Sequence, residues 1–346
     1  MSRSGLLLGA MMVALVPAGA SAHIRWFIDD EARYPPRWSR LFSLDAALVL
    51  VVTLVLLAGL LLTRRMLGTN DFPNPHVLRY MEPSATALLA VHTGISLIYF
   101  ASQVQLFVPT LGLGSGLIAA ALVLCQIVVS ISLISGLLDR AGALLLALVW
   151  LLGFAVFPAW KMVDQSLYVG ISLCLFVLGR TIPPPSIARE LLPLAQYERH
   201  SVAALRVLAG VSIAFVGFSE KILAPDAGAE FLATYPRFNV LRELLGWDWW
   251  TDERFVIAAG VAEASVGLLL ISGVLTRVVI LALLAPFNVT VAFLPPIELL
   301  GHLPIFGAMY VLLLYGSGIE PHVHEQLLDP ALEQEHSAMD PAPGSP

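Results

Sequence analysis

Long apolar runs separated by short polar breaks fill most of the chain between residues 43 and 317. Most of these runs are close to the roughly 17–25 residues with which a helix crosses a bilayer. Proline and glycine mark many of the breaks, as in the run Pro183-Pro184-Pro185. The pattern predicts nine membrane-spanning helices, near residues 43–62, 83–108, 115–137, 141–158, 165–180, 201–220, 255–273, 276–294 and 303–317.

The first 22 residues follow a different pattern. Arg3 precedes a short apolar stretch at 6–16, and the small residues Ala20-Ser21-Ala22 follow it. This order is typical of a secretory signal peptide, and the apolar stretch is too short to cross a bilayer comfortably. We expect cleavage after Ala22, which makes His23 the first residue of the mature chain, outside the cytoplasm. An uncleaved first helix is the alternative.

The composition narrows the class of protein. Hydrophobic residues make up 58% of the 346 residues and charged residues 13%, whereas soluble domains carry about 25% charged residues. The mean hydropathy is +0.83. These values exclude an ordinary soluble enzyme and a disordered regulator, and the net charge of −6 argues against a nucleic-acid partner. Two cysteines exclude a disulfide scaffold. The predicted fold class is an all-α polytopic membrane protein in a lipid bilayer.

The short loops indicate the orientation, because they carry most of the topological information. With the mature N-terminus outside, the pair Arg64-Arg65 and both tight turns lie inside, and the short outside loops carry little beyond Lys161. The predicted signal peptide agrees with this orientation. We therefore expect a bacterial inner (plasma) membrane protein with its mature N-terminus outside and its C-terminus in the cytoplasm.

One octapeptide occurs twice. Residues 133–140 (Leu-Ile-Ser-Gly-Leu-Leu-Asp-Arg) reappear at 270–277 (Leu-Ile-Ser-Gly-Val-Leu-Thr-Arg), with six of eight residues identical at an offset of 137. The same offset maps Gln126 onto Glu263. Four predicted helices separate the copies, an even number, so both copies point the same way through the bilayer, as in parallel repeats. We expect one leading helix followed by two parallel-repeat four-helix bundles.

These patterns divide the chain into seven parts. Trp247, Trp249 and Trp250 give the longest outside loop a preference for the membrane interface. The polar, acidic tail is expected to be disordered, because it buries too little apolar surface to fold. The parts are a signal peptide (1–22), a periplasmic N-terminal segment (23–42), a leading transmembrane helix with a cytoplasmic loop (43–79), a first four-helix repeat (80–180), a cytoplasmic linker (181–199), a second four-helix repeat (200–317) with a periplasmic Trp-rich loop (221–254), and a cytoplasmic tail (318–346).

The second bundle carries the motifs of a known family. Arg206 lies in its first helix, which ends in Gly217-Phe218-Ser219-Glu220-Lys221; the next helix has Glu263, then Gly267, and closes with Gly273-Val274-Leu275-Thr276-Arg277. In this order the second bundle resembles the DoxX/DoxD family of four-helix membrane proteins. Some members are linked to quinone-dependent sulfur oxidation and others to redox stress, and many have no assigned reaction. The resemblance implies a quinone-interacting redox subunit or the partner of one.

Polar groups inside the predicted helices form the candidate catalytic set. A charged side chain in a membrane helix costs about 2.5–3.5 kcal/mol on insertion scales, so such groups usually face the bundle interior. Glu263 lies near the middle of its helix, and Arg206 and Asn288 are its expected partners. His92 lies in the middle of a helix of the first bundle. Glu263 could carry protons or bond a quinone carbonyl, and His92 could relay protons or ligate a metal ion. For both, a structural hydrogen bond or ion pair between helices is the alternative.

His23 points to metal chemistry. A histidine at a mature N-terminus offers an amine and an imidazole to one metal ion, and imidazole suits copper. His302 is expected on the same side of the membrane, so the two residues predict a copper site near the outer surface. The alternative is that cleavage happens to precede a histidine, with Trp26 and Phe27 seating the segment at the membrane interface.

Three functions follow from these features. The first is a DoxX-like, quinone-interacting redox subunit, acting with a periplasmic redox partner. The second is a proton-coupled small-molecule transporter that uses Glu263 and His92 as a proton relay. The third is a non-catalytic membrane assembly factor that presents the Trp-rich loop and a periplasmic metal site to an outside partner.

Overall fold

The computed structural model of the chain describes residues 23–28, 30–42, 76–180 and 194–318, with a few positions between 51 and 65. Regular structure in these parts is helical, and one isolated bridge joins Gln105 to Gly112. The predicted signal peptide, most of the leading helix, most of the linker and nearly all of the tail lie outside the described residues.

The helices fall into short N-terminal turns, long bundle helices and a group of short helices between them. In chain order they are η1 (Ile24–Phe27), η2 (Glu31–Arg33), η3 (Trp38–Phe42), η4 (His76–Ser84), α3 (Ala85–Ser102), α4 (Leu117–Ser135), α5 (Asp139–Gly153), α6 (Ala159–Asp164), α7 (Leu167–Leu178), η5 (Ala195–Tyr197), α9 (Glu198–Val216), η6 (Gly217–Ile222), α10 (Pro225–Thr234), η7 (Pro236–Phe238), α11 (Val240–Glu243), α12 (Asp252–Ser272), α13 (Thr276–Phe293) and α14 (Ile297–Tyr315).

Among the described residues, six helical segments are long and apolar enough to cross a membrane, so the chain is a multi-pass helical membrane protein. The predicted spans 141–158 and 165–180 form the shorter helices α5 and α7, and the predicted total of nine spans is not confirmed. The six segments are Tyr80–Ser102, Leu117–Ser135, Glu198–Ile222, Asp252–Ser272, Thr276–Phe293 and Ile297–Tyr315.

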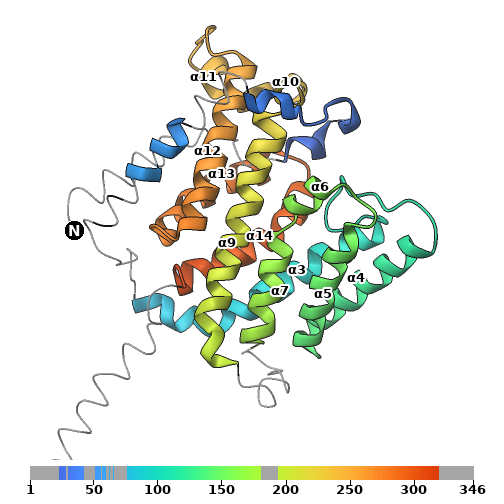
Figure 1. The fold of residues 1–346 in the computed structure, drawn as a ribbon. Coiled ribbons are helices and arrows are strands. Elements are labelled where there is room, and N and C mark those ends of the chain that lie inside the picture. The colour runs from blue at the N-terminus through green and yellow to red at the C-terminus, as the bar shows by residue number, and fades with distance from the viewer. Residues whose placement is uncertain are drawn as a thin grey trace, which may run out of the picture.

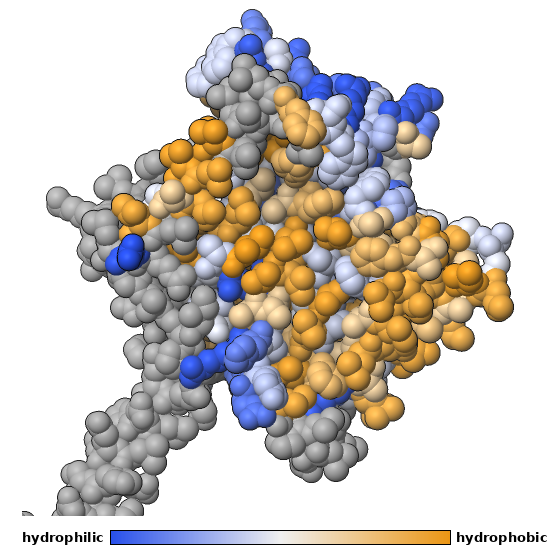
Figure 2. All heavy atoms as spheres, viewed as in Figure 1, coloured by the Kyte–Doolittle hydropathy of each residue, from blue (hydrophilic) through white to orange (hydrophobic). Residues whose placement is uncertain are grey.

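Helix α9 runs through the middle of the bundle and packs on both α7 and α12 (Figure 1). The last helix, α14, packs on α3, while α5 packs on α4 and α7. Outward-facing side chains of α4 and α5 are apolar, among them Leu117, Leu124, Leu144 and Leu151. They form part of a broad hydrophobic surface (Figure 2), as expected of helices that face lipid.

The two copies of the repeated octapeptide adopt the same turn. Gly136 and Gly273 end α4 and α12 in the left-handed conformation, with φ of 76° and 72°. Leu138 and Leu275 follow with φ of 52° and 50° and begin the next helices. A leucine in this conformation is strained, because its Cβ crowds the backbone. Both sequences therefore specify one unusual backbone path.

Two arginines after these turns make matching contacts. Nη2 of Arg140 donates to the carbonyl oxygen of Val177 at 3.0 Å, and Nη2 of Arg277 donates to that of Leu314 at 2.9 Å. Each acceptor lies in the last turn of a helix, where carbonyls lack intrahelical partners. The parallel-repeat layout itself stays a prediction.

Helices and turns cover one end of the bundle, uppermost in Figure 1 and here called the η1 end. The predicted outside loop 221–254 is largely helical and contains α10, η7 and α11. Phe231 and Phe238 pack with Phe255 of α12 and Ile24 of η1 in a hydrophobic cluster separate from the bundle core. This cluster fixes the N-terminal segment to the end of the membrane helices.

Candidate functional site

The site at the η1 end begins with an irregular helix end. Helix α9 continues into η6, a π-helical turn that carries Glu220 and Lys221, and both side chains are buried. Single π-helical turns occur frequently at functional sites. Here the turn brings an acidic and a basic side chain into the protein interior at the end of a membrane span.

Close packing of α9 and η6 on α12 sets the depth of these side chains. A Cβ on Gly217 would lie 2.9 Å from the carbonyl oxygen of Gly260, so the two backbones meet with no room for a side chain. Small residues permit such approach between membrane helices. Beside this contact, Nζ of Lys221 donates to both carboxylate oxygens of Glu263, at 2.8 and 2.7 Å.

The N-terminal segment enters the site from the other side. Trp26 lies directly on α14, because a Cβ on Gly301 would come within 2.3 Å of the indole ring. The ring of His23 stacks on Trp26, with centroids 4.2 Å apart, and on His302, with centroids 5.3 Å apart. Two rings from distant parts of the chain, those of Trp26 and His302, therefore hold His23 in place.

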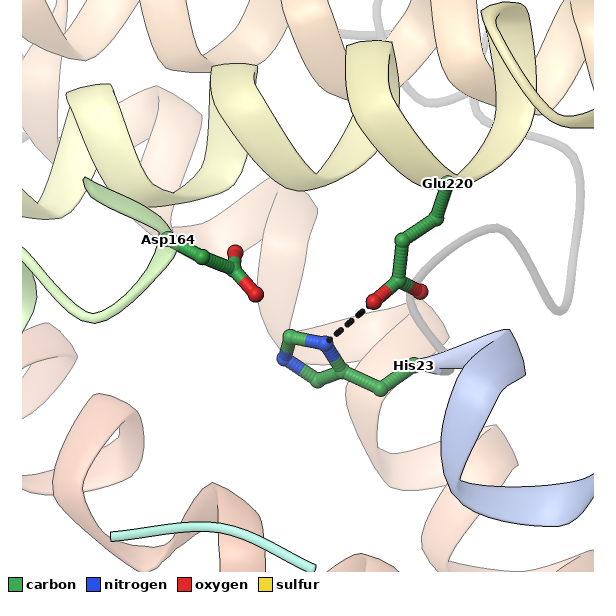
Figure 3. A group of neighbouring side chains, drawn as sticks. All are labelled: His23, Asp164 and Glu220. Atoms are coloured by element: carbon green, nitrogen blue, oxygen red, sulfur yellow. Dashed lines mark ion pairs between the residues drawn. The ribbon is translucent and has the colours of Figure 1, made fainter. Parts of the chain in front are cut away.

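His23, Asp164 and Glu220 converge on one point (Figure 3). One nitrogen or oxygen atom from each side chain lies within 4.8 Å of the others. Nδ1 of His23 is 3.6 Å from Oε1 of Glu220. Helix α6 supplies Asp164, whose carbonyl oxygen accepts a hydrogen bond from Ser212 of α9. The three side chains come from the N-terminal segment, α6 and η6.

Several polar atoms of this group lack hydrogen-bond partners within the described residues. They include Nδ1 of His23, Oδ1 of Asp164 and Oε2 of Glu220, all shielded from solvent. Glu220 is only 3% exposed. A buried carboxylate without partners is costly, because it loses its hydration. The unpaired atoms therefore indicate that the group takes a proton, water or a cation.

Charge in the site supports the same conclusion. Burial raises the pKa of Asp164 well above its usual range, and the carboxylate of Glu220 adds to this effect. Arg25 and Lys221 oppose it. Lys221 is engaged with Glu263, and Nη2 of Arg25 donates to the carbonyl oxygen of Tyr34 at 2.8 Å. The two carboxylates near His23 thus share the positive charges of Arg25 and Lys221 with other acceptors.

His302 lies next to the group of His23, Asp164 and Glu220, and its hydrogen bonding defines its tautomer. Its Nδ1 is 2.8 Å from the carbonyl oxygen of Glu298, which can only accept, so Nδ1 carries the proton. Its Nε2 is buried and has no hydrogen-bond partner among the described residues. The stacked rings direct His302 beside His23 rather than onto the shared point of His23, Asp164 and Glu220, and His302 is outside that convergent group.

A cavity of about 70 Å³ adjoins these side chains. Its volume accommodates a few water molecules or a small polar group. Residues of α9, α12, α13 and α14 line the cavity together with the N-terminal segment and Asp164, and the lining contains both polar and apolar side chains. The polar lining includes His23, Asp164, Glu263 and His302, and the apolar lining includes Leu283 and Phe287.

The residues predicted as the catalytic set are not brought together. Glu263 pairs with Lys221, which differs from the expected partners. Arg206 donates to the carbonyl oxygens of Ser317, Leu270 and Ile271, and so ties helix ends together. The amide of Asn288 donates to the carbonyl oxygen of Leu284 within its own helix. His92 packs near Gly307.

The predicted metal residues, in contrast, are neighbours. The sequence placed His23 and His302 on one side of the membrane, and the structure stacks their rings. Sequence reasoning missed Asp164 as a candidate ligand and assigned Glu220 no ligand role. Asp164 is the last residue of the short helix α6, and nothing in its local sequence indicates that α6 packs on α9. For Glu220, the available sequence signal was its position in the motif Gly217-Phe218-Ser219-Glu220-Lys221 at the end of a predicted membrane helix.

Comparisons with known proteins give no further assignment: no family model, no curated protein and no solved structure matches the chain.

Proposed function

We propose that this chain is a DoxX-like integral protein of the bacterial inner membrane that binds a divalent transition-metal ion at the η1 end, outside the cytoplasm. The convergence of His23, Asp164 and Glu220 within 4.8 Å carries this proposal. Such a site suits the third function expected from the sequence, an assembly factor that presents a metal to a periplasmic partner.

The donor set favours copper(II). Imidazole nitrogen suits copper, zinc and nickel, and for a given nitrogen–oxygen site copper(II) binds most tightly of the divalent first-row metals. Two carboxylates, Asp164 and Glu220, balance a charge of +2, so the filled site carries no net charge of its own. That balance matters because an uncompensated charge is costly in a buried site.

The neighbours of the ligands suit a structured metal site. Metal-bound residues are oriented by partners that hold them from behind. Trp26 and His302 hold the ring of His23, and Gln165 donates to Oδ2 of Asp164 at 3.3 Å. Lys221 neighbours Glu220 and is drawn toward Glu263 by their ion pair.

The finer architecture belongs to the same proposal. A signal peptide that ends at Ala22 and a parallel duplication of four-helix bundles both agree with the proposed orientation. The matched turns at Gly136 and Gly273 and the matched contacts of Arg140 and Arg277 support the duplication. Asp164 and Glu220, however, lie in different predicted bundles, so the metal site lies between the two.

The test is metal binding by the purified, full mature chain in a mild detergent. Titration with copper(II) is expected to saturate at one ion per chain. Replacing His23 by alanine should abolish tight binding, whereas His92→Ala, a histidine variant away from the site, should keep it. Equal binding by both variants, or no saturable binding by the wild-type chain, would overturn the proposal.

A quinone is the second candidate ligand. The cavity lining combines apolar side chains, Leu283 and Phe287, with polar ones, Glu263 and His302, as quinone binding requires, but its volume of about 70 Å³ must increase to admit the ring. Because Trp26 lines the cavity, a short-chain benzoquinone that binds there should quench tryptophan fluorescence to saturation. Quenching unchanged in Phe287→Ala would argue against this site.

A further inference from the structure

His23 has a second kind of nitrogen besides those of its ring, the backbone nitrogen, and this inference rests on the function proposed above. Nδ1 of His23 faces Glu220, at 3.6 Å from Oε1, and His23 belongs to the convergent group. A metal on Nδ1 is within reach of the same residue's backbone nitrogen, because the two nitrogens close a six-membered ring with the metal through Cα, Cβ and Cγ. His23 therefore offers two donors from one residue if its nitrogen is a ligand.

Whether that nitrogen is a ligand depends on the peptide bond before it. An amide nitrogen shares its lone pair with the carbonyl group and is a poor donor. A free α-amino group has an ordinary pKa of about 7.7–8.0, so its neutral form donates readily near neutral pH. Hydrolysis of the Ala22–His23 bond changes one into the other.

We infer that removal of the signal peptide completes the metal site by supplying the α-amino group of His23 as a fourth ligand. The step is a hydrolysis: the C–N bond between Ala22 and His23 breaks, water gives its oxygen to the Ala22 carboxyl group, and the His23 nitrogen gains a proton. The resulting set is two nitrogens from His23 and one oxygen each from Asp164 and Glu220.

The segment after His23 is built to hold this end in position. The carbonyl oxygen of His23 accepts from the N–H of Trp26 at 3.0 Å, so a hydrogen-bonded turn follows His23 directly. Ile24 and Arg25 are 4% and 5% exposed. Arg25 also lies over the ring of Trp160, with its Cζ 5.3 Å from the ring centroid. Several buried contacts thus fix the chain direction immediately after the new terminus.

A ligand set of two nitrogens and two oxygens gives a second reason to assign copper(II) as the metal. Square-planar nitrogen and oxygen coordination is typical of copper(II), whereas oxygen-rich sites suit magnesium, calcium or manganese. The uncleaved chain would offer one nitrogen and two oxygens at this point. The site would therefore bind copper(II) tightly only after export and cleavage. At that stage His23 lies outside the cytoplasm, on the side of the proposed partner.

The experiment compares two full-length mature chains in detergent. One begins at His23, as verified by intact mass, and the other carries four additional alanines before His23, so that its free amino group lies away from the imidazole and cannot join it in a chelate. Both are titrated with copper(II) against a chelator of known affinity, and the bound ion is examined by electron paramagnetic resonance. The chain that begins at His23 should show two nitrogen ligands. The extended chain should show one, with affinity lower by at least the roughly 10–100-fold that loss of an outer-shell partner costs.

The outcomes separate this inference from the function on which it rests. If both chains bind copper(II) alike, with one nitrogen each, the amino group is not a ligand and the inference fails while the metal site stands. If neither chain binds copper(II), the proposed function fails with it. A mature chain from the native membrane that begins at a residue other than His23 would also overturn the inference.

Discussion

The imidazole rings of His23 and His302 stack with their centroids 5.3 Å apart, although His23 precedes the first described helix and His302 lies in the last. The contact means that α14 sets the position of a proposed metal ligand from the opposite end of the chain. Trp26, which packs on Gly301, reinforces this link. The site thus depends on how the N-terminal segment docks as well as on the ligands themselves.

The two carboxylates should each be necessary for tight metal binding. Asp164→Asn and Glu220→Gln keep the size of the side chain but remove one negative charge and one strong donor. We expect copper(II) affinity to fall by at least about 10–100-fold in each variant. Competition with a chelator measures the change, and Glu243→Gln in α11 is the matched control, away from the site. Unchanged affinity in both variants would remove Asp164 and Glu220 from the ligand set.

Docking of the N-terminal segment can be disturbed without touching any ligand. In Gly301→Ala the new methyl group would lie 2.3 Å from Trp26, so the indole must move and His23 with it. Overpacking of this kind costs about 1–3 kcal/mol, and we expect lower copper(II) affinity along with a lower Tm. Gly112→Ala is the control, because its Cβ would meet nothing within 4 Å. Wild-type affinity in Gly301→Ala would show that docking does not position His23.

The sequence predicts a helical membrane protein, because apolar runs of this length are typical of membrane-spanning helices. It also predicts that His23 and His302 share a side of the membrane. It does not predict the partner of Glu263, because Lys221 reaches it only through a π-helical turn and the glycine contact between Gly217 and Gly260. Such contacts depend on how backbones pack, which local patterns do not encode.

The ion pair between Lys221 and Glu263 should be more important to stability than to metal binding. Lys221→Met leaves the buried carboxylate of Glu263 without its cation, a change that typically costs about 3–5 kcal/mol. Adding Glu263→Gln to Lys221→Met should recover much of that loss, because the uncompensated charge is gone. Thermal unfolding of Lys221→Met, Glu263→Gln and the double variant in one detergent measures the coupling energy between the two residues. Additive losses in the double variant would show that the pair does not stabilise the fold.

Acidic pH should stabilise the metal-free protein through Asp164. Its pKa in the folded chain is raised well above the ordinary value, which is about 3.9 in an unfolded chain. The folded state therefore holds this proton more tightly, so the contribution is fully present below about pH 4 and declines as the pH rises toward the folded-state pKa. The charged and titratable groups near Asp164 are Glu220, His23, Arg25 and Lys221.

The contribution of Asp164 is isolated by comparing the wild-type chain with Asp164→Asn, because the amide does not titrate and the neighbours are unchanged. We expect Tm of the metal-free wild-type chain to fall more steeply with increasing pH than Tm of the variant. Copper(II) should reverse the trend in the wild-type chain, because a metal binds the ionised carboxylate and its affinity rises as ligands lose protons. Parallel pH profiles for both chains, with and without copper(II), would mean that Asp164 does not titrate in the site and is not a metal ligand.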